Sequence, residues 1–270
     1  MEKLIEKYRY SLILLRELVK TDFKLRYEGS ALGMVWSALR PLLLFGVMYV
    51  VFVHFLKFGA GIPFFAVSLL LAIVLWNFFS ETTAQGMRAI VDNGGILRKI
   101  NIPKYVLVVS ASMSALINLG ISLVIVLVFS IISGVEFSPT VFLIIPIIIE
   151  LYIFALAIAM ILSALYVKFR DLGHIWDVVM QAGYFATPII YPLSMIISFS
   201  PLAAKVLLMN PMAQMIQDAR WAVTYSGTET VWNTVGNPLI AIIPILIVII
   251  VAVIAVFYFR RESQRFTEDL

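Results

Sequence analysis

Three carboxylates lie within or beside long apolar stretches of the chain and are its first candidates for chemistry. Glu81 lies late in one apolar run, Glu150 lies within another, and Asp177 is close to the start of a third. Ionisable side chains at membrane depth are costly and usually functional, and a proton-coupled carrier would use such groups. However, no clear chain of acids and bases connects them into a relay. For Glu150 the alternative is a residue that faces a bundle interior or a wet cavity and pairs with a hydroxyl.

Motifs for nucleotide binding and for common hydrolases are missing from the sequence. It contains no G-x-x-x-x-G-K-[ST], no H-E-x-x-H and no G-x-S-x-G. Cysteine is absent, and the two histidines, His54 and His174, lie far apart, which leaves neither a disulfide framework nor a metal-ligand cluster. We therefore expect no catalytic residue, no metal site and no cofactor in this chain. Transport is the leading class of function, and an intramembrane enzyme is a weaker alternative.

The composition is that of an integral membrane protein. The 270 residues are 62% hydrophobic and only 13% charged, whereas soluble domains carry roughly 25% charged residues. Nucleic acid is a poor partner, because the basic residues flank the apolar runs instead of forming one soluble face. No cleavable signal peptide is apparent, since the first apolar run begins at about Met34 after a charged segment.

The apolar runs that must position these groups predict an all-α membrane protein with six transmembrane helices. The first run would be about 33 Å long at 1.5 Å per residue, enough to cross a bilayer. Residues 28–270 would form this transmembrane domain. The six predicted spans are 35–56, 64–87, 106–133, 140–167, 175–191 and 238–259.

Residues 1–27 contain no spanning run and predict a cytoplasmic amphipathic interface helix. Apolar side chains recur there at spacings of three and four, with basic and acidic residues between them. A basic helix of this kind lies in the plane of the membrane, docks a partner, or does both. The apolar stripe consists of Leu4, Tyr8, Leu12, Leu15, Val19 and Phe23.

The stretch 182–223 is apolar but interrupted by Pro188, Pro192, Pro201 and Pro211. Backbone at membrane depth must be hydrogen-bonded within a helix or covered by protein or a water-filled cavity. We therefore predict that the fifth span stops inside the membrane and is followed by short re-entrant helices before the sixth. Such a segment would line or gate a pathway. The alternative is a slightly hydrophobic loop outside the membrane.

Charge placement predicts the orientation of the chain. With six spans, both termini lie on one side together with all lysines and arginines except Lys57, Lys205 and Arg220. The positive-inside rule then places both termini in the cytoplasm and the broken stretch on the outer face.

Four blocks of sequence resemble ABC-2 type permeases. FKLRYEGSALGMVWSALRPLL (23–43) resembles the segment that leads into the first span of that family, and NGGILRKINIPKYVLVVSASMSALIN (93–118) resembles the segment after its second span. YVKFRDLGHI (166–175) resembles its short cytoplasmic loop between spans four and five, and TPIIYPLSMI with MNPMAQMIQDARWAV resembles its outer re-entrant region. The blocks occur in the family's order and leave little of the chain uncovered. The closest subgroup is the permeases of polysaccharide exporters, of the O-antigen and teichoic-acid types.

The resemblance implies a homodimer with two copies of a separate ATPase subunit, which would hold the ATP and magnesium. Its implied substrate is a lipid-linked polysaccharide, moved from the cytoplasm to the outer face of the bacterial inner membrane. In the family, the interface helix and the loop after span two contact the ATPase, with a smaller contact from the loop before span five. The alternative for the loop after span two is a connector that anchors to anionic lipid. Carried over, the contact residues are Asp92, Ile96, Leu97, Arg98, Lys99, Ile100, Arg170 and Asp171.

Closure of the ATPase would shift spans one and five, which border the channel, and the broken stretch would act as the outer gate. Aromatic rings could pack against the C–H faces of sugars, although an interfacial belt is the alternative for Trp176 and Trp221. The predicted channel or gate residues are Tyr49, Phe52, Phe79, Tyr184, Pro188, Tyr191, Pro192 and Ser194.

Two other functions remain open. An ABC-2 permease for a drug or small lipid would share all these motifs, and neighbouring genes for glycan synthesis would distinguish it. A secondary carrier would need no ATPase, but no internal inverted repeat is visible in the sequence.

Overall fold

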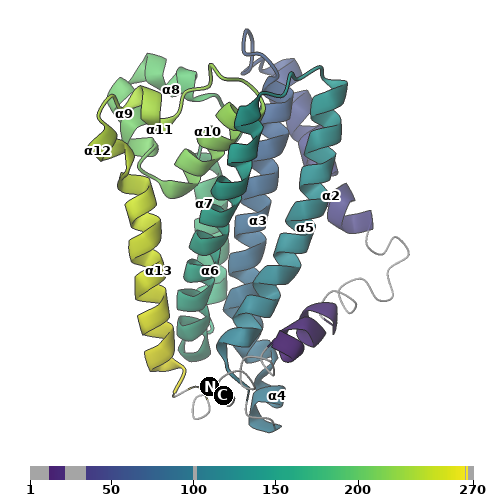
Figure 1. The fold of residues 1–270 in the computed structure, drawn as a ribbon, viewed down its shortest axis with the longest axis vertical. Helices are drawn as coiled ribbons and strands as arrows, with labels where there is room; N and C mark the ends of the chain where they lie inside the picture. The colour runs from purple at the N-terminus through teal and green to yellow at the C-terminus, as the bar shows by residue number, and fades with distance from the viewer. Residues whose placement is uncertain (1–11, 22–34, 100–101, 265, 267–270) are drawn as a thin grey trace.

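The computed structural model describes residues 12–21, 35–99, 102–264 and 266, and regular structure in this part of the chain is entirely helical (Figure 1). Residues 12–21 are helical, while the rest of the predicted interface helix and Ile100 lie outside the described residues. The further helices are α2 (Val35–Met48), the π-helix η1 (Tyr49–Phe55), α3 (Phe65–Asp92), α4 (Gly94–Lys99), α5 (Tyr105–Ile132), the 3-10 helix η2 (Pro139–Leu143), α6 (Ile144–Lys168), α7 (Leu172–Ala186), α8 (Leu193–Phe199), α9 (Pro201–Leu207), α10 (Pro211–Val223), α11 (Val231–Thr234), α12 (Pro238–Ala241) and α13 (Ile243–Glu262).

Four helical segments among the described residues are long and apolar enough to cross a membrane. They are Phe65–Asp92, Tyr105–Ile132, Pro139–Lys168 and Pro238–Glu262, with lengths of 28, 28, 30 and 25 residues. These segments confirm four of the predicted spans. The second span is longer than predicted, because the helix continues through the polar residues up to Asp92.

The other two predicted spans correspond to shorter helices. The first is α2 continued by η1, whose apolar part is Pro41–Phe55. The second is α7, which has 15 residues and ends at Ala186, so the prediction that this helix reaches Tyr191 was wrong. The residue before a proline is pushed out of the helical region, and Thr187, which precedes Pro188, is extended with φ −101° and ψ 143°.

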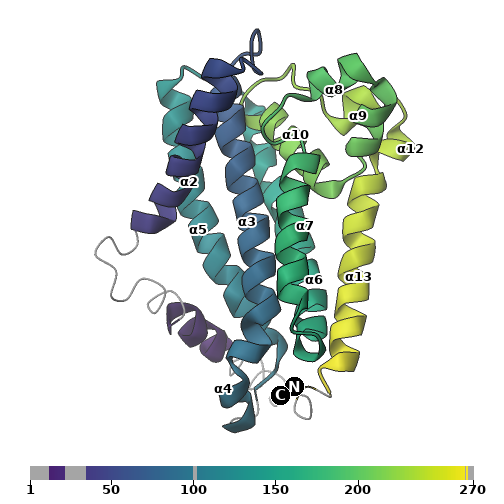
Figure 2. The same ribbon diagram turned by 180° about the vertical axis from the view of Figure 1, so that it is seen from behind.

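Helix α3 lies at the centre of the bundle, between α5, α6 and α7 (Figures 1 and 2). Every residue from 67 to 76 is buried, as expected for a helix that is apolar on all sides and surrounded by other helices. Its contact with α6 is close at Gly86, where an added Cβ would lie 2.6 Å from the Cβ of Ala159. Small residues permit this approach of helix backbones.

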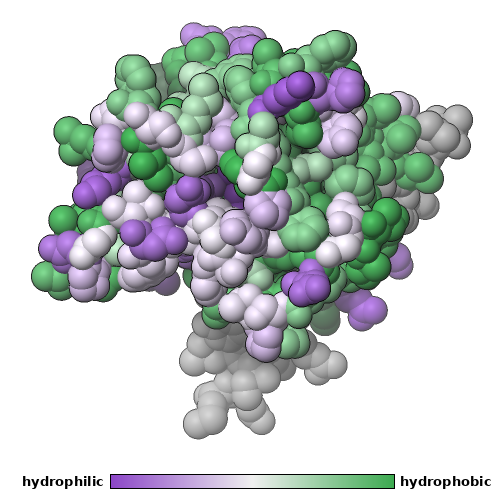
Figure 3. All heavy atoms as spheres, turned by 90° about the horizontal axis from the view of Figure 1, so that it is seen from above, coloured by the Kyte–Doolittle hydropathy of each residue, from purple (hydrophilic) through white to green (hydrophobic). Residues whose placement is uncertain are grey.

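The two ends of the bundle differ. One end carries α8 to α12, which we call the cap, together with the loop 56–64 (Figure 1). Its surface mixes hydrophilic and hydrophobic residues (Figure 3). The opposite end carries α4, the helix 12–21 and the ends of α6 and α13 (Figure 2). There Lys168 and Glu262 form an ion pair, and Lys104 donates a hydrogen bond to the Ser263 carbonyl.

The packing at Gly86 gives a test of the bundle. We expect Gly86→Ala to lower the free energy of unfolding by about 1–3 kcal/mol, because the added methyl group overlaps Ala159. Gly120→Ala is the matched control, since nothing lies within 4 Å of a Cβ at that position in α5. Equilibrium unfolding in mixed micelles measures both variants, and equal stability of the two would contradict the close α3–α6 contact.

Candidate functional site

The break between α7 and α8 is the least regular part of the described helical bundle. It comprises Thr187 to Pro192, of which all but Tyr191 are buried. Its two prolines carry no backbone N–H, and Thr187 and Ile189 donate theirs to the Gly183 and Thr187 carbonyls at 2.9 and 2.7 Å. The prediction that prolines divide this segment into short helices is confirmed by α8, α9 and α10, the last two of which begin at Pro201 and Pro211.

Arg220 of α10 reaches the break and hydrogen-bonds its carbonyl groups. The side chain is 3% exposed. Nη1 donates to the Pro188 carbonyl at 2.7 Å, and Nη2 donates to the Ile189 carbonyl at 2.6 Å. A buried carbonyl without a donor costs about 1–3 kcal/mol, so this guanidinium stabilises a backbone that cannot satisfy itself.

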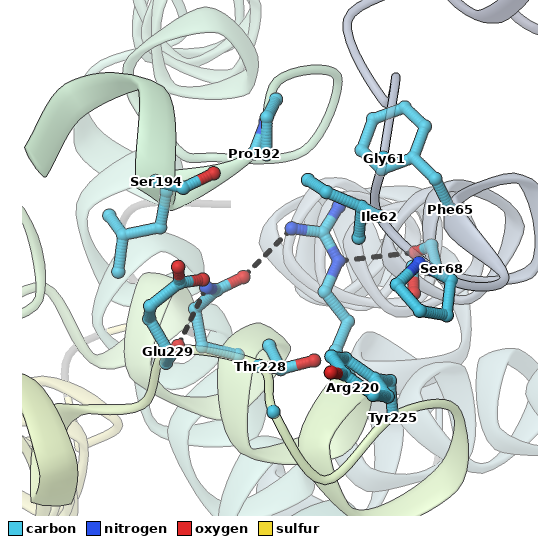
Figure 4. Close-up of a pocket in the computed structure, with 14 residues that line it drawn as sticks. Gly61, Ile62, Phe65, Ser68, Pro192, Ser194, Arg220, Tyr225, Thr228 and Glu229 are labelled. Atoms are coloured by element: carbon cyan, nitrogen blue, oxygen red, sulfur yellow. Dashed lines mark hydrogen bonds between the residues drawn. The ribbon is translucent and has the colours of Figure 1, made fainter. Parts of the chain in front are cut away.

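The same guanidinium connects the break to the central helix. Nε donates to the Ser68 carbonyl of α3 at 3.2 Å, and Nη1 also donates to Gln217 Oε1 at 2.8 Å (Figure 4). Beside it, the hydroxyls of Ser68 and Thr224 are 2.8 Å apart. Arg220 therefore joins α3, α10 and the break at one point, which we call the arginine clamp.

The charge of the clamp is balanced by dipoles. A guanidinium is not deprotonated in proteins, so Arg220 carries its charge in the break. No carboxylate among the described residues forms an ion pair with it. Carbonyl oxygens surround it instead, and its position in the last turn of α10 adds the negative end of a helix dipole.

A cavity of about 180 Å³ opens above the clamp at the cap end of the molecule (Figure 4). Its walls come from the loop before α3, from the start of α8 and from the segment after α10, and they include the predicted gate residues Pro192 and Ser194. Gln217 fixes one wall by donating to the Glu229 carbonyl at 2.8 Å. The arginine clamp thus forms the floor of a small cavity between elements that are distant in the sequence.

Below the break, α7 packs against α3 through aromatic rings. The ring centroids of Trp76 and Tyr184 are 6.0 Å apart, and a Cβ on Gly183 would lie 2.9 Å from the indole of Trp76. Phe79 stacks on Phe154 with centroids 5.4 Å apart and is 4% exposed. Of these predicted channel residues, Tyr184 is half-buried at the α3–α7 contact, whereas Phe79 lies inside the protomer.

The predicted channel residues of the first span lie on η1. Tyr49 is 40% exposed and packs near Phe45, with ring centroids 5.7 Å apart. Phe52 is half-buried beside Phe58. Helices α2 and α7 lie on the same face of the molecule, on either side of α3 (Figure 2). The residues on α7 and η1 therefore share a face. The remaining predicted channel residue, Tyr191, lies in the break and donates a hydrogen bond from its hydroxyl to the Phe185 carbonyl at 3.1 Å.

The described residues among those expected to contact an ATPase belong to elements at the end opposite the cap. Asp92, Arg170 and Asp171 are exposed, and the Arg170 guanidinium lies 5.6 Å from the centre of the Tyr166 ring. Leu97 is 7% exposed and packs in the protomer's own apolar core. The side chains of Ile96, Arg98 and Lys99 lie outside the part that the structure describes.

The acidic residues do not form a relay in the described contacts. Glu81 accepts hydrogen bonds from Asn118 at 2.8 Å and Gln85 at 2.9 Å, which is a bundle-interior role. Asp177 is exposed on α7.

Sequence reasoning missed the role of Arg220, and the signal that could have found it is a basic side chain in an apolar helix directly after a broken backbone.

Long apolar helices and a buried backbone break define a multi-pass membrane protein. A family model described as "ABC-2 type transporter" matches residues 13–224. The chain belongs to the ABC-2 type transporter family, and the resemblance seen in the sequence blocks is confirmed.

The chain is also similar to proteins named "O-antigen export system permease protein RfbA". The protein from Myxococcus xanthus is 31% identical over 259 residues, which cover 96% of each chain. One from Klebsiella pneumoniae is 29% identical over 206 residues, covering 73% of this chain and 79% of that protein.

The clamp predicts a specific loss of stability. Arg220→Lys keeps the charge, but three donors on one ammonium cannot reach carbonyls of α3 and of two residues in the break together. We expect the free energy of unfolding to fall by about 1–3 kcal/mol for each carbonyl left without a donor. Lys205→Met, which removes an exposed cation of α9, is the control. A change below about 0.5 kcal/mol in Arg220→Lys, the size expected of a surface substitution, would refute the clamp.

Proposed function

We propose that this chain is the transmembrane permease subunit of an ATP-driven exporter that moves lipid-linked polysaccharide from the cytoplasm to the outer face of the inner membrane. The observation that carries the proposal is similarity over 96% of both chains to an O-antigen export permease. The sequence has no P-loop, so a separate ATPase subunit, present in two copies, would bind ATP and magnesium.

The working unit in this proposal is a homodimer with six spans per chain. Only Gly173 of α7 is buried, while Ile175, Val178 and Phe185 are 57%, 66% and 55% exposed. The face that α7 shares with η1 is therefore apolar and open, as expected if a second copy covers it. Helices α2–η1 and α7 would supply spans one and five, with the channel between the two copies.

The cap would lie at the outer face, with both termini in the cytoplasm. Lys57, Lys205 and Arg220 belong to the cap end, while Arg88, Lys104, Lys168, Arg170, Arg260 and Arg261 belong to elements of the opposite end. This asymmetry supports the orientation. Helices α8 to α10 would then enter the membrane from outside, and the arginine clamp would supply the hydrogen bonds that broken backbone needs at that depth.

Export would couple the two ends of the molecule. Closure of the ATPase subunits would push on α4 and on the turn that holds Arg170 and Asp171, and thus on α7. The clamp ties Pro188 and Ile189 to α10 and α3, so movement of α7 would be taken up in the residues on either side of these two. Residues Tyr191, Pro192 and Ser194 would then open or close the outer gate, with Pro188 held by the clamp.

Deletion of the gene tests the cargo. We expect lipid-linked glycan to accumulate on the cytoplasmic side of the membrane, and the intact gene to restore export. Normal surface glycan together with loss of export of a drug or small lipid would contradict the polysaccharide assignment.

A bulky side chain tests the gate. We expect Ser194→Trp to slow export severalfold, because the indole would fill the cavity that Ser194 lines, while co-purification of the ATPase subunit is unchanged. Ser198→Trp, one turn further along α8 at an exposed position, should export normally. Loss of ATPase association in Ser194→Trp would count against the gate.

Charge reversal tests the opposite end. Arg98→Glu with Lys99→Glu should leave ATP hydrolysis running but uncouple it from export, since the loop after span two would no longer transmit closure. Lys57→Glu reverses a charge at the cap end and should leave coupling intact. Normal coupling in the double variant would remove these residues from the ATPase contact.

A further inference from the structure

A second cavity, which the export mechanism does not use, lies where the cap end of α6 meets α10 and α11. Its volume is about 460 Å³. Thr140 of η2 fixes one side by donating to the Ala222 carbonyl at 3.2 Å. One wall is apolar, and the other is aromatic and polar. The lining residues are Leu143, Pro146, Ile147, Asp218, Trp221, Thr230, Trp232 and Asn233.

A hydrogen-bond acceptor is left over at the polar wall. Asp218 Oδ2 accepts from Gln214 Nε2 at 2.7 Å, but Asp218 Oδ1 is buried and has no donor among the described residues. Gln214 Oε1 and Glu150 Oε1 are also buried without a donor among the described residues, but neither side chain lines the cavity. Buried polar atoms are normally satisfied, so Asp218 Oδ1 is an acceptor on this wall that a donor from a bound ligand would satisfy.

Asn233, which also lines the polar wall, already donates hydrogen bonds to other groups of the cap. Asn233 Nδ2 donates to the Thr228 carbonyl at 3.2 Å, and the Asn233 backbone N–H donates to Thr230 Oγ1 at 3.4 Å. A sugar hydroxyl brings an acceptor together with each donor, and this wall has few donors left to offer. The site therefore selects a ligand that mainly donates.

The charge of the lining selects a cation. The lining contains one carboxylate and neither lysine nor arginine. It also contains the indoles of Trp221 and Trp232, and indole is the aromatic ring that attracts ammonium groups most strongly. A carboxylate with an unsatisfied acceptor oxygen and two indoles together fit an organic ammonium group.

We propose that the cavity binds the ammonium group of a phospholipid with an ethanolamine headgroup. The apolar wall continues onto the lipid-exposed surface of η2 and α6, where Phe142, Leu143 and Ile145 are 71%, 45% and 57% exposed. A phospholipid places its headgroup beside Asp218 and its acyl chains along this surface. The proposal requires only that the protein lies in a membrane and is independent of the exported cargo.

Lipid binding to the purified full-length permease tests the site. Native mass spectrometry of delipidated protein would compare phosphatidylethanolamine, phosphatidylcholine and phosphatidylglycerol of identical acyl chains. We expect phosphatidylethanolamine to bind most tightly, because only its headgroup offers an ammonium with N–H donors. Asp218→Asn should raise the Kd for this lipid at least ~10-fold, the loss of one charge-assisted hydrogen bond.

Matched variants separate binding from folding. Trp232→Leu changes a side chain that is 49% exposed and should also weaken binding, while Glu136→Gln removes an exposed carboxylate at the cap end and should not. Thermal unfolding would show that each variant is folded. Equal affinity for phosphatidylglycerol, or unchanged affinity in both Asp218→Asn and Trp232→Leu, would overturn the proposal. Binding of soluble glycerophosphoethanolamine as tight as that of the lipid would overturn the membrane source of the ammonium.

Discussion

A buried guanidinium that hydrogen-bonds the carbonyl groups of a broken helix is the interaction on which the cap end depends. Buried backbone groups need hydrogen-bond partners within the protein, and two prolines remove donors from residues 187–192. Arg220 provides donors from another helix and at the same time contacts α3 through the Ser68 carbonyl. The break is therefore supported by hydrogen bonds from a neighbouring helix.

This constraint explains the division of the bundle into buried and open parts. Helix α3 is surrounded by the other helices and holds the clamp, whereas only Gly173 of α7 is buried. Helix α7 contacts α3 through Gly183 and Tyr184 at Trp76 and through a 3.1 Å hydrogen bond from Trp176 to Thr83. The exposed apolar side chains of α7 are the surface that the proposed second copy would cover. The lipid site proposed at Asp218 and the clamp at Arg220 lie on the same helix, so α10 would separate the proposed gate from the proposed membrane contact.

Much of this fold could be predicted from the sequence because uninterrupted apolar runs define helices independently of their neighbours. The helices α5, α6 and α13 follow their predicted spans closely, and the proline spacing predicted the short helices of the cap. The direction in which each side chain points could not be predicted, since α3 is apolar on all sides and nothing in its pattern places Phe79 inside the protomer.

Leu97 was expected to contact the ATPase subunit, but within the protomer it belongs to the same apolar cluster as Phe266. Such long-range contacts leave no local pattern in the sequence. In the helix 12–21, Leu14 and Leu18 pack on the protein although they lie outside the predicted apolar stripe, while Leu12 of the stripe is exposed. A periodic stripe predicts a helix but does not say which surface will cover it. Arg220 was counted only as an outer charge, because its role depends on carbonyls about 30 residues earlier.

Nuclear magnetic resonance of ¹⁵N-arginine-labelled permease in micelles tests the clamp most directly, with the Arg220→Lys variant assigning the signal. A guanidinium that donates to the Ser68, Pro188 and Ile189 carbonyls rotates slowly and is shielded from solvent. The clamp predicts separate Nη–H resonances for Arg220 that persist after transfer to D₂O. A single averaged Nη signal that disappears as fast as those of exposed arginines would contradict it.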